Sequence, residues 1–140
     1  MDVRAVGPDD WQVWRRLRLA ALRDAPDAFE SAYEKWAHAP EERWRRRLAG
    51  SLDLVARLDG ADVGMVSGMP GDPVELISLW VAPAARGRGV GDALVDGVAR
   101  WADPRPVRLR VAAGNAHALA LYLRHGFVVE PGGALVRVPR

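Results

Sequence analysis

The first third of the chain combines one strand pattern with two helical patterns. Residues 2–6, DVRAV, alternate in apolar character, which predicts a strand. Residues 8–25 place apolar side chains at helical spacing, and Pro26 ends this pattern. A second helical region covers residues 27–49 and is interrupted near Pro40. We therefore expect one strand followed by two helical segments.

The middle of the chain holds three apolar stretches of strand length separated by turn residues. They read LDLVARL, VGMVSGM and VELISLWV, at residues 52–58, 63–69 and 74–81. The segments between them, DGAD and PGDP, contain the Gly, Pro and Asp residues that favour tight turns. Three short strands joined in this way predict an antiparallel meander.

The last third alternates helices with strands. Residues 91–102 have helical periodicity, and a further helix follows between Asn115 and Gly126, which suit its two ends as N-cap and C-cap. Strand patterns lie between these helices and after them, at residues 107–113, 127–130 and 134–139. The last two strands are joined by a short Pro-Gly-Gly turn, which predicts a closing hairpin.

The order of these elements predicts the fold class. The strand, glycine loop, helix and strand around residue 81 should form a right-handed crossover between parallel strands. We therefore expect an α/β fold of the α+β type, with a mixed, mostly antiparallel sheet of six to seven strands and helices on both faces. At 140 residues, the chain has room for one compact domain, residues 1–140.

Composition narrows the class of protein. Apolar residues make up 49% and charged residues 27%, as in soluble globular proteins. No apolar run reaches the ~20 residues of a membrane span, and residues 1–11 lack the apolar core of a signal peptide. We therefore expect a cytoplasmic protein without a membrane partner. The chain has no cysteine, and its three histidines have no acidic residues at matching spacing, so we expect no metal.

Positive charge is spread along the chain. The formal net charge is +2, and Lys35 is the sole lysine among 20 basic residues. A nucleic-acid-binding protein would gather positive charge on one surface, whereas acidic residues here lie among the arginines. We therefore expect no nucleic-acid partner, and a basic nucleic-acid- or partner-binding domain ranks third among the functional hypotheses.

The most informative stretch joins an apolar strand to a helix. Residues 86–91, Arg-Gly-Arg-Gly-Val-Gly, contain three glycines, where a tight turn would need one. A helix N-terminus exposes unpaired N–H groups and a partial positive charge. Glycines before it let a ligand approach the backbone closely, because no Cβ intervenes. With Arg86 and Arg88 beside it, this junction predicts a site for a phosphorylated ligand.

Two motifs together indicate a family. A P-loop would need a lysine after Gly91, and a dinucleotide fingerprint would need glycine in place of Asp92, so neither matches. The pattern R-x-x-G-x-G at residues 86–91 does fit, and NAHALALYLRHGF further on matches N-x-x-A-x-x-L-Y-x-x-x-G-F. Over nearly the whole chain, the sequence resembles the GNAT acetyltransferase superfamily. The resemblance implies the GNAT fold and a loop that wraps the pyrophosphate of acetyl-CoA.

The resemblance also implies roles for particular residues. In the family, the strand before the loop separates from its neighbouring strand. Its backbone groups would therefore bind the pantetheine arm, and the Val81 N–H would bind the acyl carbonyl. Tyr122 would protonate the departing thiolate, although it also fits a packing position. Asn115 caps its helix and would touch CoA or the acceptor. The expected acetyl-CoA-binding residues are Leu79, Trp80, Val81, Arg86, Gly87, Arg88, Gly89, Val90, Gly91, Asp92, Asn115 and Tyr122.

The general base is the least determined part of the site. An alkyl ammonium has a pKa near ~10, so a carboxylate commonly assists, often through water. Strict alternation puts Glu75 on the same strand face as Leu79 and Val81, and family members often carry a glutamate on this strand. Glu75 is therefore the first candidate, with Glu30 and Glu34 as alternatives. All three are also compatible with solvated surface carboxylates.

These inferences lead to an acetyl-CoA-dependent N-acetyltransferase without a metal. Its acceptor would be the primary amine of a small molecule or the amino group of a peptide or protein, in a ternary complex. A non-catalytic acyl-CoA-binding or regulatory module of the same fold is the alternative. Dimers are common in the family, so the resemblance is also compatible with a homodimer.

Overall fold

The computed structural model describes residues 1–24, 26–111 and 115–139. In the second helix, it describes side chains only from residue 32 onward. In chain order, the elements are β1 (Asp2–Ala5), η1 (Pro8–Asp10), α1 (Trp11–Asp24), α2 (Pro26–Ala37), α3 (Glu41–Leu48), β2 (Leu52–Leu58), β3 (Ala61–Met69), β4 (Val74–Val81), η2 (Pro83–Ala85), α4 (Val90–Ala102), β5 (Val107–Leu109), α5 (Ala116–Arg124), β6 (Val128–Val129) and β7 (Leu135–Arg137).

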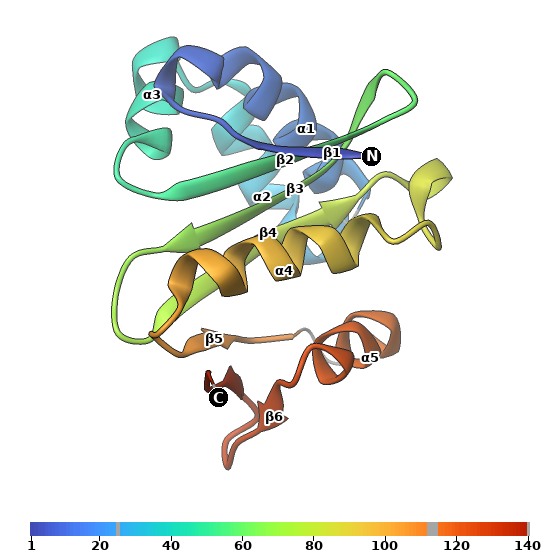
Figure 1. Cartoon of the computed structure of the whole chain (residues 1–140). Helices are drawn as coiled ribbons and strands as arrows, with labels where there is room; N and C mark the ends of the chain where they lie inside the picture. Colours follow the sequence, from blue (N-terminus) through green and yellow to red (C-terminus); the bar gives the residue numbers. More distant parts are fainter. Residues whose placement is uncertain (25, 112–114, 140) are drawn as a thin grey trace.

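One seven-stranded sheet forms the centre of the molecule (Figure 1), in the order β1-β2-β3-β4-β5-β7-β6. Strands β4 and β5 pair in parallel, and all the other neighbouring strands pair antiparallel. The crossover through α4 therefore joins the one parallel pair among the described strands. The expected mixed, mostly antiparallel sheet, with its meander and closing hairpin, is confirmed.

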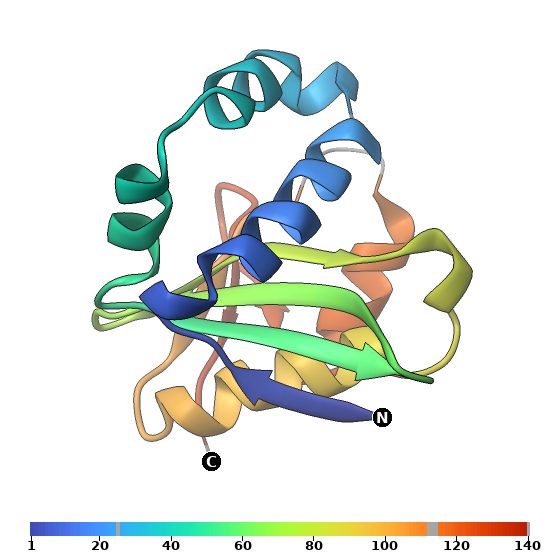
Figure 2. The same cartoon turned by 90° about the horizontal axis from the view of Figure 1, so that it is seen from above.

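Helices cover both faces of the sheet, as expected (Figure 2). On one face, apolar residues of α4 and α5 pack on alternate residues of β2, β3 and β4, including Leu54, Val66 and Leu76. On the other face, α1 and α3 pack on the intervening residues Val55 and Met65. The period-2 alternation of β2 and β3 thus supplies two separate apolar clusters.

Several element boundaries differ from the expectations. The first helix opens with the 3-10 turn of η1, and α4 begins at Val90, one residue before the expected Gly91. The strand expected over residues 107–113 ends at Leu109, and residues 112–113 of it lie outside the described part of the chain. Its shortness matters for the site, because β4 continues where β5 has ended.

A buried polar network stands between α3 and the sheet. Asp53 and Ser67 are fully buried on the α3 face of β2 and β3. Asp53 lies 3.2 Å from Arg47 Nη1 and accepts hydrogen bonds from Ser51 (2.6 Å) and Ser67 (2.7 Å). Arg47 also donates to Ser67 at 2.8 Å. Because Asp53 and Ser67 both have partners, α3 is fixed to the sheet by directional bonds as well as by apolar contacts.

Candidate active site

The parallel strands separate after a short shared stretch. Among the described residues, β4 pairs with β5 only at Val74↔Val107 and Glu75↔Arg108, whereas β4 continues to Val81. Over residues 76–81, β4 is therefore paired with β3 on one side, while β5 has left the other side. The splaying expected before the glycine loop is confirmed.

Val81 directs its backbone groups toward this separation. The next residue, Ala82, donates its N–H to the Val63 carbonyl at 2.7 Å, and Val81 stands opposite Gly64. Because bonded and non-bonded pairs alternate along an antiparallel ladder, the N–H and C=O of Val81 point away from β3. The C=O accepts a hydrogen bond from Arg86 Nε at 3.0 Å, and the N–H faces the side that β5 has left.

A bulge in β4 changes the expected alternation of its side chains. The register against β3 slips by one residue at Ser78, which has a positive φ of 61°. Leu76, Leu79 and Val81 consequently all contact the cluster on the α4 side, and Glu75 points to the opposite face. The expectation that Glu75 shares a face with Leu79 and Val81 is wrong, because the extra residue inverts the alternation.

Two glycines before α4 suit the close approach of a ligand. Gly87 and Gly89 have φ values of 79° and 83°, where most side chains are strained, and a Cβ on either would meet no atom within 4 Å. Gly89 is the N-cap of α4 and provides no side-chain cap. The first N–H groups of α4 therefore have no intrahelical partner. Open space in front of these N–H groups fits a phosphate.

Gly91 serves the packing of two helices. Its φ is not positive, and a Cβ at this position would lie 3.2 Å from Cδ2 of Leu121 on α5. Gly64 on β3 has a similar role, because a Cβ there would lie 2.9 Å from Val90 Cγ1. These two glycines allow the first turn of α4 to approach both α5 and the sheet.

Arg86 is bound to the end of α1. Its Nη2 lies 2.6 Å from Asp24 Oδ2, which also accepts a hydrogen bond from Trp80 Nε1 at 3.0 Å. The hydrogen bond from Trp80, followed by that from Arg86, lowers the pKa of Asp24. Asp24 lies 62 residues before Arg86, so no local pattern in the sequence could reveal this contact.

The other charged residues of the loop also have protein partners. Arg88 lies 3.2 Å from Asp59, with both side chains mostly exposed. Asp92 lies 2.8 Å from His125 Nε2 and 3.0 Å from Arg124. Burial opposes ionisation of Asp92, but the hydrogen bonds from His125 and Arg124 outweigh it and lower its pKa. His125 is the half-buried C-cap of α5.

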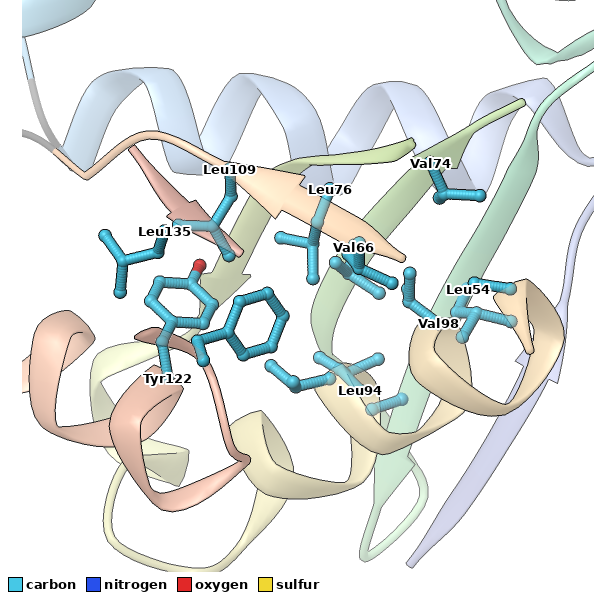
Figure 3. Packing of buried hydrophobic residues seen from close by; sticks show 14 of the residues in the cluster. Leu54, Val66, Val74, Leu76, Leu94, Val98, Leu109, Tyr122 and Leu135 are labelled. Carbon is cyan, nitrogen blue, oxygen red and sulfur yellow. The ribbon is translucent and has the colours of Figure 1, made fainter. Parts of the chain in front are cut away.

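Tyr122 points from α5 into the apolar cluster, among Leu109 and Leu135 (Figure 3). Its ring packs edge-on against Phe127 at 5.5 Å between centroids, and only 6% of the residue is exposed. Burial raises the pKa of Tyr122 to about 12. The phenol therefore keeps its proton at neutral pH. Its hydroxyl makes no hydrogen bond to any residue that the structure describes.

Asn115 has the cap role expected from the sequence. Its side-chain oxygen accepts a hydrogen bond from the Ala118 N–H at 3.1 Å.

The carboxylates considered as general bases lie on different elements of the fold. Glu75 is exposed at the start of β4, and Glu34 lies on α2, 3.4 Å from His38. The side chain of Glu30 lies outside the described part of the chain.

The structure places Gly87 and Gly89 directly before α4, near the end of β4, as the sequence predicted, whereas Glu75 lies on the opposite face of the sheet from Leu79 and Val81. The sequence analysis missed Asp24. In the described part of the chain, no group of three or more His, Asp or Glu side chains is arranged to hold a metal ion. None of the helices described there is long and apolar enough to cross a membrane.

Comparisons with known proteins identify acetyltransferases as relatives of the chain. Two curated relatives match part of the chain. An aminoglycoside N(6')-acetyltransferase of Stenotrophomonas maltophilia is 31% identical over 71% of this chain and 65% of its own length. An L-2,4-diaminobutyric acid acetyltransferase of Nocardia farcinica is 36% identical over 61% of this chain and 51% of its own length. The chain thus spans less than two thirds of each relative.

A solved structure matches the fold over almost the entire chain. It is the PaiA N-acetyltransferase of Thermoplasma acidophilum in complex with coenzyme A, with a TM-score of 0.79 and 17% identity over 99% of this chain and 98% of that one. The family model of the Acetyltransferase (GNAT) family matches residues 14–127, from the first turn of α1 to the residue before β6. This span includes the separated strands and the glycine loop, and the chain belongs to the GNAT acetyltransferase family.

Proposed function

We propose that the chain is an acetyl-CoA-dependent N-acetyltransferase that acts on the primary amine of a small molecule. The observation that carries the proposal is the glycine loop at the N-terminus of α4, beside the edge of β4 that β5 has left. The relatives named for aminoglycoside and diaminobutyric acid acetylation support a small-molecule amine over a protein amino group.

The residues around the opening fit acetyl-CoA as a substrate. The N–H groups that follow Gly87 and Gly89 would hold the pyrophosphate, because no Cβ fills the space before them. The edge of β4 at Leu79, Trp80 and Val81 would lie along the pantetheine arm, and backbone hydrogen bonds to it would come from residues that, like Val81, point away from β3. Arg86 would act indirectly, since its guanidinium is already bound to Asp24 and to the Val81 carbonyl.

The proposed chemistry is direct transfer. The neutral acceptor amine attacks the thioester carbonyl, and the C–S bond breaks after a tetrahedral intermediate. The Val81 N–H would stabilise the oxyanion. Tyr122 would donate its proton to the thiolate sulfur, which a buried and fully protonated phenol can do. Glu75, which lies six residues before Val81 on β4, would take the proton lost by the amine through a chain of waters on the face opposite to α4.

Binding and turnover test the proposal separately. Acetyl-CoA at 100 times its Kd should stabilise the fold by about 2.7 kcal/mol in thermal melts, whereas ATP and NADH should not. Gly89→Trp should abolish this shift, because the indole would fill the phosphate space. Release of free thiol in the presence of a primary amine should then be measurable. Acetyl-CoA binding without turnover on any amine would instead support a non-catalytic acyl-CoA-binding module.

A further inference from the structure

Arg108 on β5 and Arg110, just after the end of β5, differ from most arginines in the contacts of their side chains. Within the described part of the chain, most arginines hold a carboxylate, a carbonyl, a hydroxyl or an aromatic ring. Among the residues that the structure describes, Arg108 and Arg110 have no such partner, and Arg18 on α1 is the third arginine of this kind. Both Arg108 and Arg110 are exposed. Two guanidinium groups with the single carboxylate of Glu75 beside them leave local positive charge unbalanced.

These arginines line a shallow depression together with the candidate base. The depression has a volume of about 230 Å³ and is lined by Pro73, Glu75, Arg108, Leu109 and Arg110. It lies where β4 and β5 are still paired, since Glu75 and Arg108 are partners in the parallel ladder. Val107 and Leu109 point into the α4-side cluster, so Arg108 and Glu75 face the opposite side of the sheet, as does Arg110 by alternation.

The chemistry of this depression suits a molecule with two opposite charges. Arg108 and Arg110 are two residues apart on an extended segment, which places their Cα atoms about 7 Å from each other. Guanidinium groups at this spacing can bind one carboxylate from two sides, because each presents N–H donors in a planar fork. The exposed carboxylate of Glu75 on the neighbouring strand can bind an ammonium group.

We propose that the acceptor is a small amino acid with a free amine, and that Arg108 and Arg110 bind its carboxylate beside Glu75. This inference rests on the proposed acetyltransferase function and names its acceptor class. The volume of the depression is below the roughly 300–1,000 Å³ of sites for drug-sized ligands, which favours a molecule of amino-acid size. A polycationic acceptor such as an aminoglycoside would be repelled by the two arginines.

The directions of β4 and β5 indicate that the reacting amine would lie at the end of the acceptor away from its carboxylate. Strands β4 and β5 run parallel, so Arg110 lies further toward the separated end than Arg108. If the register of Glu75 and Arg108 is extended, Arg110 is level with Ile77, four residues or about 13 Å before Val81, whose N–H is proposed for the acyl carbonyl. The long side chain of Arg110 can cover part of this distance, so a carboxylate that it holds would leave a side-chain amine directed along β4 toward the acyl group. Diamino acids have this arrangement of charges.

Matched acceptors that differ by a carboxylate test the inference. L-Lysine would be compared with 1,5-diaminopentane, and L-2,4-diaminobutyrate with 1,3-diaminopropane, by kcat/KM for thiol release from acetyl-CoA. We expect each amino acid to be preferred at least about tenfold, because charge-assisted hydrogen bonds contribute roughly this much. Arg108→Gln and Arg110→Gln should each remove most of the preference, because each weakens binding of the amino acid and relieves the repulsion of the diamine.

A control variant and a binding measurement separate the two proposals. Arg100→Gln changes an exposed arginine of α4, which covers the opposite face, and it should preserve the preference. Calorimetry of the same acceptors with CoA-saturated protein reads binding without turnover. If no amine is acetylated but the amino acids bind tighter, the catalytic function fails, and the assignment of Arg108 and Arg110 as a carboxylate-binding site stands without it. If diamines and amino acids perform equally, or the Arg108 and Arg110 variants match the Arg100 control, the inference is overturned.

Discussion

The guanidinium of Arg86 and the carboxylate of Asp24 lie 2.6 Å apart and join the glycine loop to the end of the first helix. The same carboxylate accepts the indole N–H of Trp80, and the same guanidinium donates to the Val81 carbonyl. Three parts of the candidate site are therefore held together at one point: α1, the end of β4 and the loop before α4. Because α1 belongs to the helical layer on the opposite face, this contact ties that layer to the loop proposed for acetyl-CoA.

Replacing Asp24 with Asn should weaken the fold in a pH-dependent way. Hydrogen bonds from Trp80 and Arg86 lower the pKa of Asp24, so its stabilising effect is present above the unfolded pKa of about 3.9 and is lost as the pH falls through the lower folded value. We expect a melting temperature about 1–4 °C below wild type at pH 5–8, as for a partly exposed ion pair. This difference should shrink below about pH 4.

The matched control for Asp24 is Asp9→Asn. Asp9 also pairs with an arginine, Arg45, at 2.8 Å, but its side chain is 97% exposed. Thermal melts of both variants from acid to neutral pH would compare them directly. An Asp24 variant that follows wild type at every pH would contradict a role for this carboxylate in holding α1 to the loop.

Gly89→Ala should separate backbone strain from ligand approach when compared with Gly50→Ala. Both glycines have φ near 80°, at 83° and 82°, and a Cβ on either would meet no protein atom within 4 Å. Each substitution should therefore cost about 1–2 kcal/mol of folding free energy. Only at Gly89 does the new Cβ stand in the proposed phosphate space. We expect calorimetry to show at least a tenfold weaker affinity for acetyl-CoA at Gly89 and an unchanged affinity at Gly50.

Tyr122→Phe should remove the proposed proton donor without disturbing the core. The phenylalanine ring keeps the edge-on contact with Phe127, so the melting temperature at neutral pH and the affinity for acetyl-CoA should stay near wild type. Loss of a general acid should lower kcat by about 100-fold. An unchanged kcat in steady-state assays would leave Tyr122 as a packing residue only.

The raised pKa of Tyr122 gives a second, independent prediction. Burial favours the neutral phenol and raises its pKa from 10.0 to about 12. The associated stability is fully present below pH 10 and is lost as the pH rises toward 12. Wild type should therefore lose stability relative to Tyr122→Phe in chemical denaturation above about pH 10. Parallel curves for the two proteins across this range would contradict burial as the cause.

Local patterns predicted the strands and the loop because their causes are local. The strand VELISLWV was expected at residues 74–81, and β4 has these bounds. Turn residues on either side fix where it can begin and end. Asn115 likewise caps α5 through a bond to Ala118, three residues away. The glycines at residues 87 and 89 were expected to allow a ligand to approach the backbone closely, and the structure adds that both have positive φ.

The remaining features depend on residues far apart in the sequence. Ser78 carries no signal for a positive φ, since the bulge arises from the fit of β4 against β3. The face of Glu75 was consequently assigned wrongly. Asp24 and Arg86 meet only once the sheet has formed between them. The early end of β5 also depends on tertiary structure, because its sequence pattern continues beyond Leu109.

The buried pair of Arg47 and Asp53 should matter far more for stability than a surface pair on the same helix. Asp53 is fully buried and Arg47 is 18% exposed, whereas Arg45 and its partner Glu41 are 39% and 56% exposed. Arg47→Met would leave the buried Asp53 without its cation, and losing one partner of a buried pair costs about 3–5 kcal/mol. Arg45→Met should cost below about 1 kcal/mol.

A double variant tests whether the cost comes from the charge that is left behind. Replacing Arg47 with Met and Asp53 with Leu removes both charges, and buried pairs replaced in this way are often neutral in stability. Equilibrium unfolding in urea should then show a double variant that is more stable than Arg47→Met alone. If the two losses simply add, the stability of this region comes from packing of α3 on the sheet, and the ion pair between Arg47 and Asp53 serves only to orient the helix.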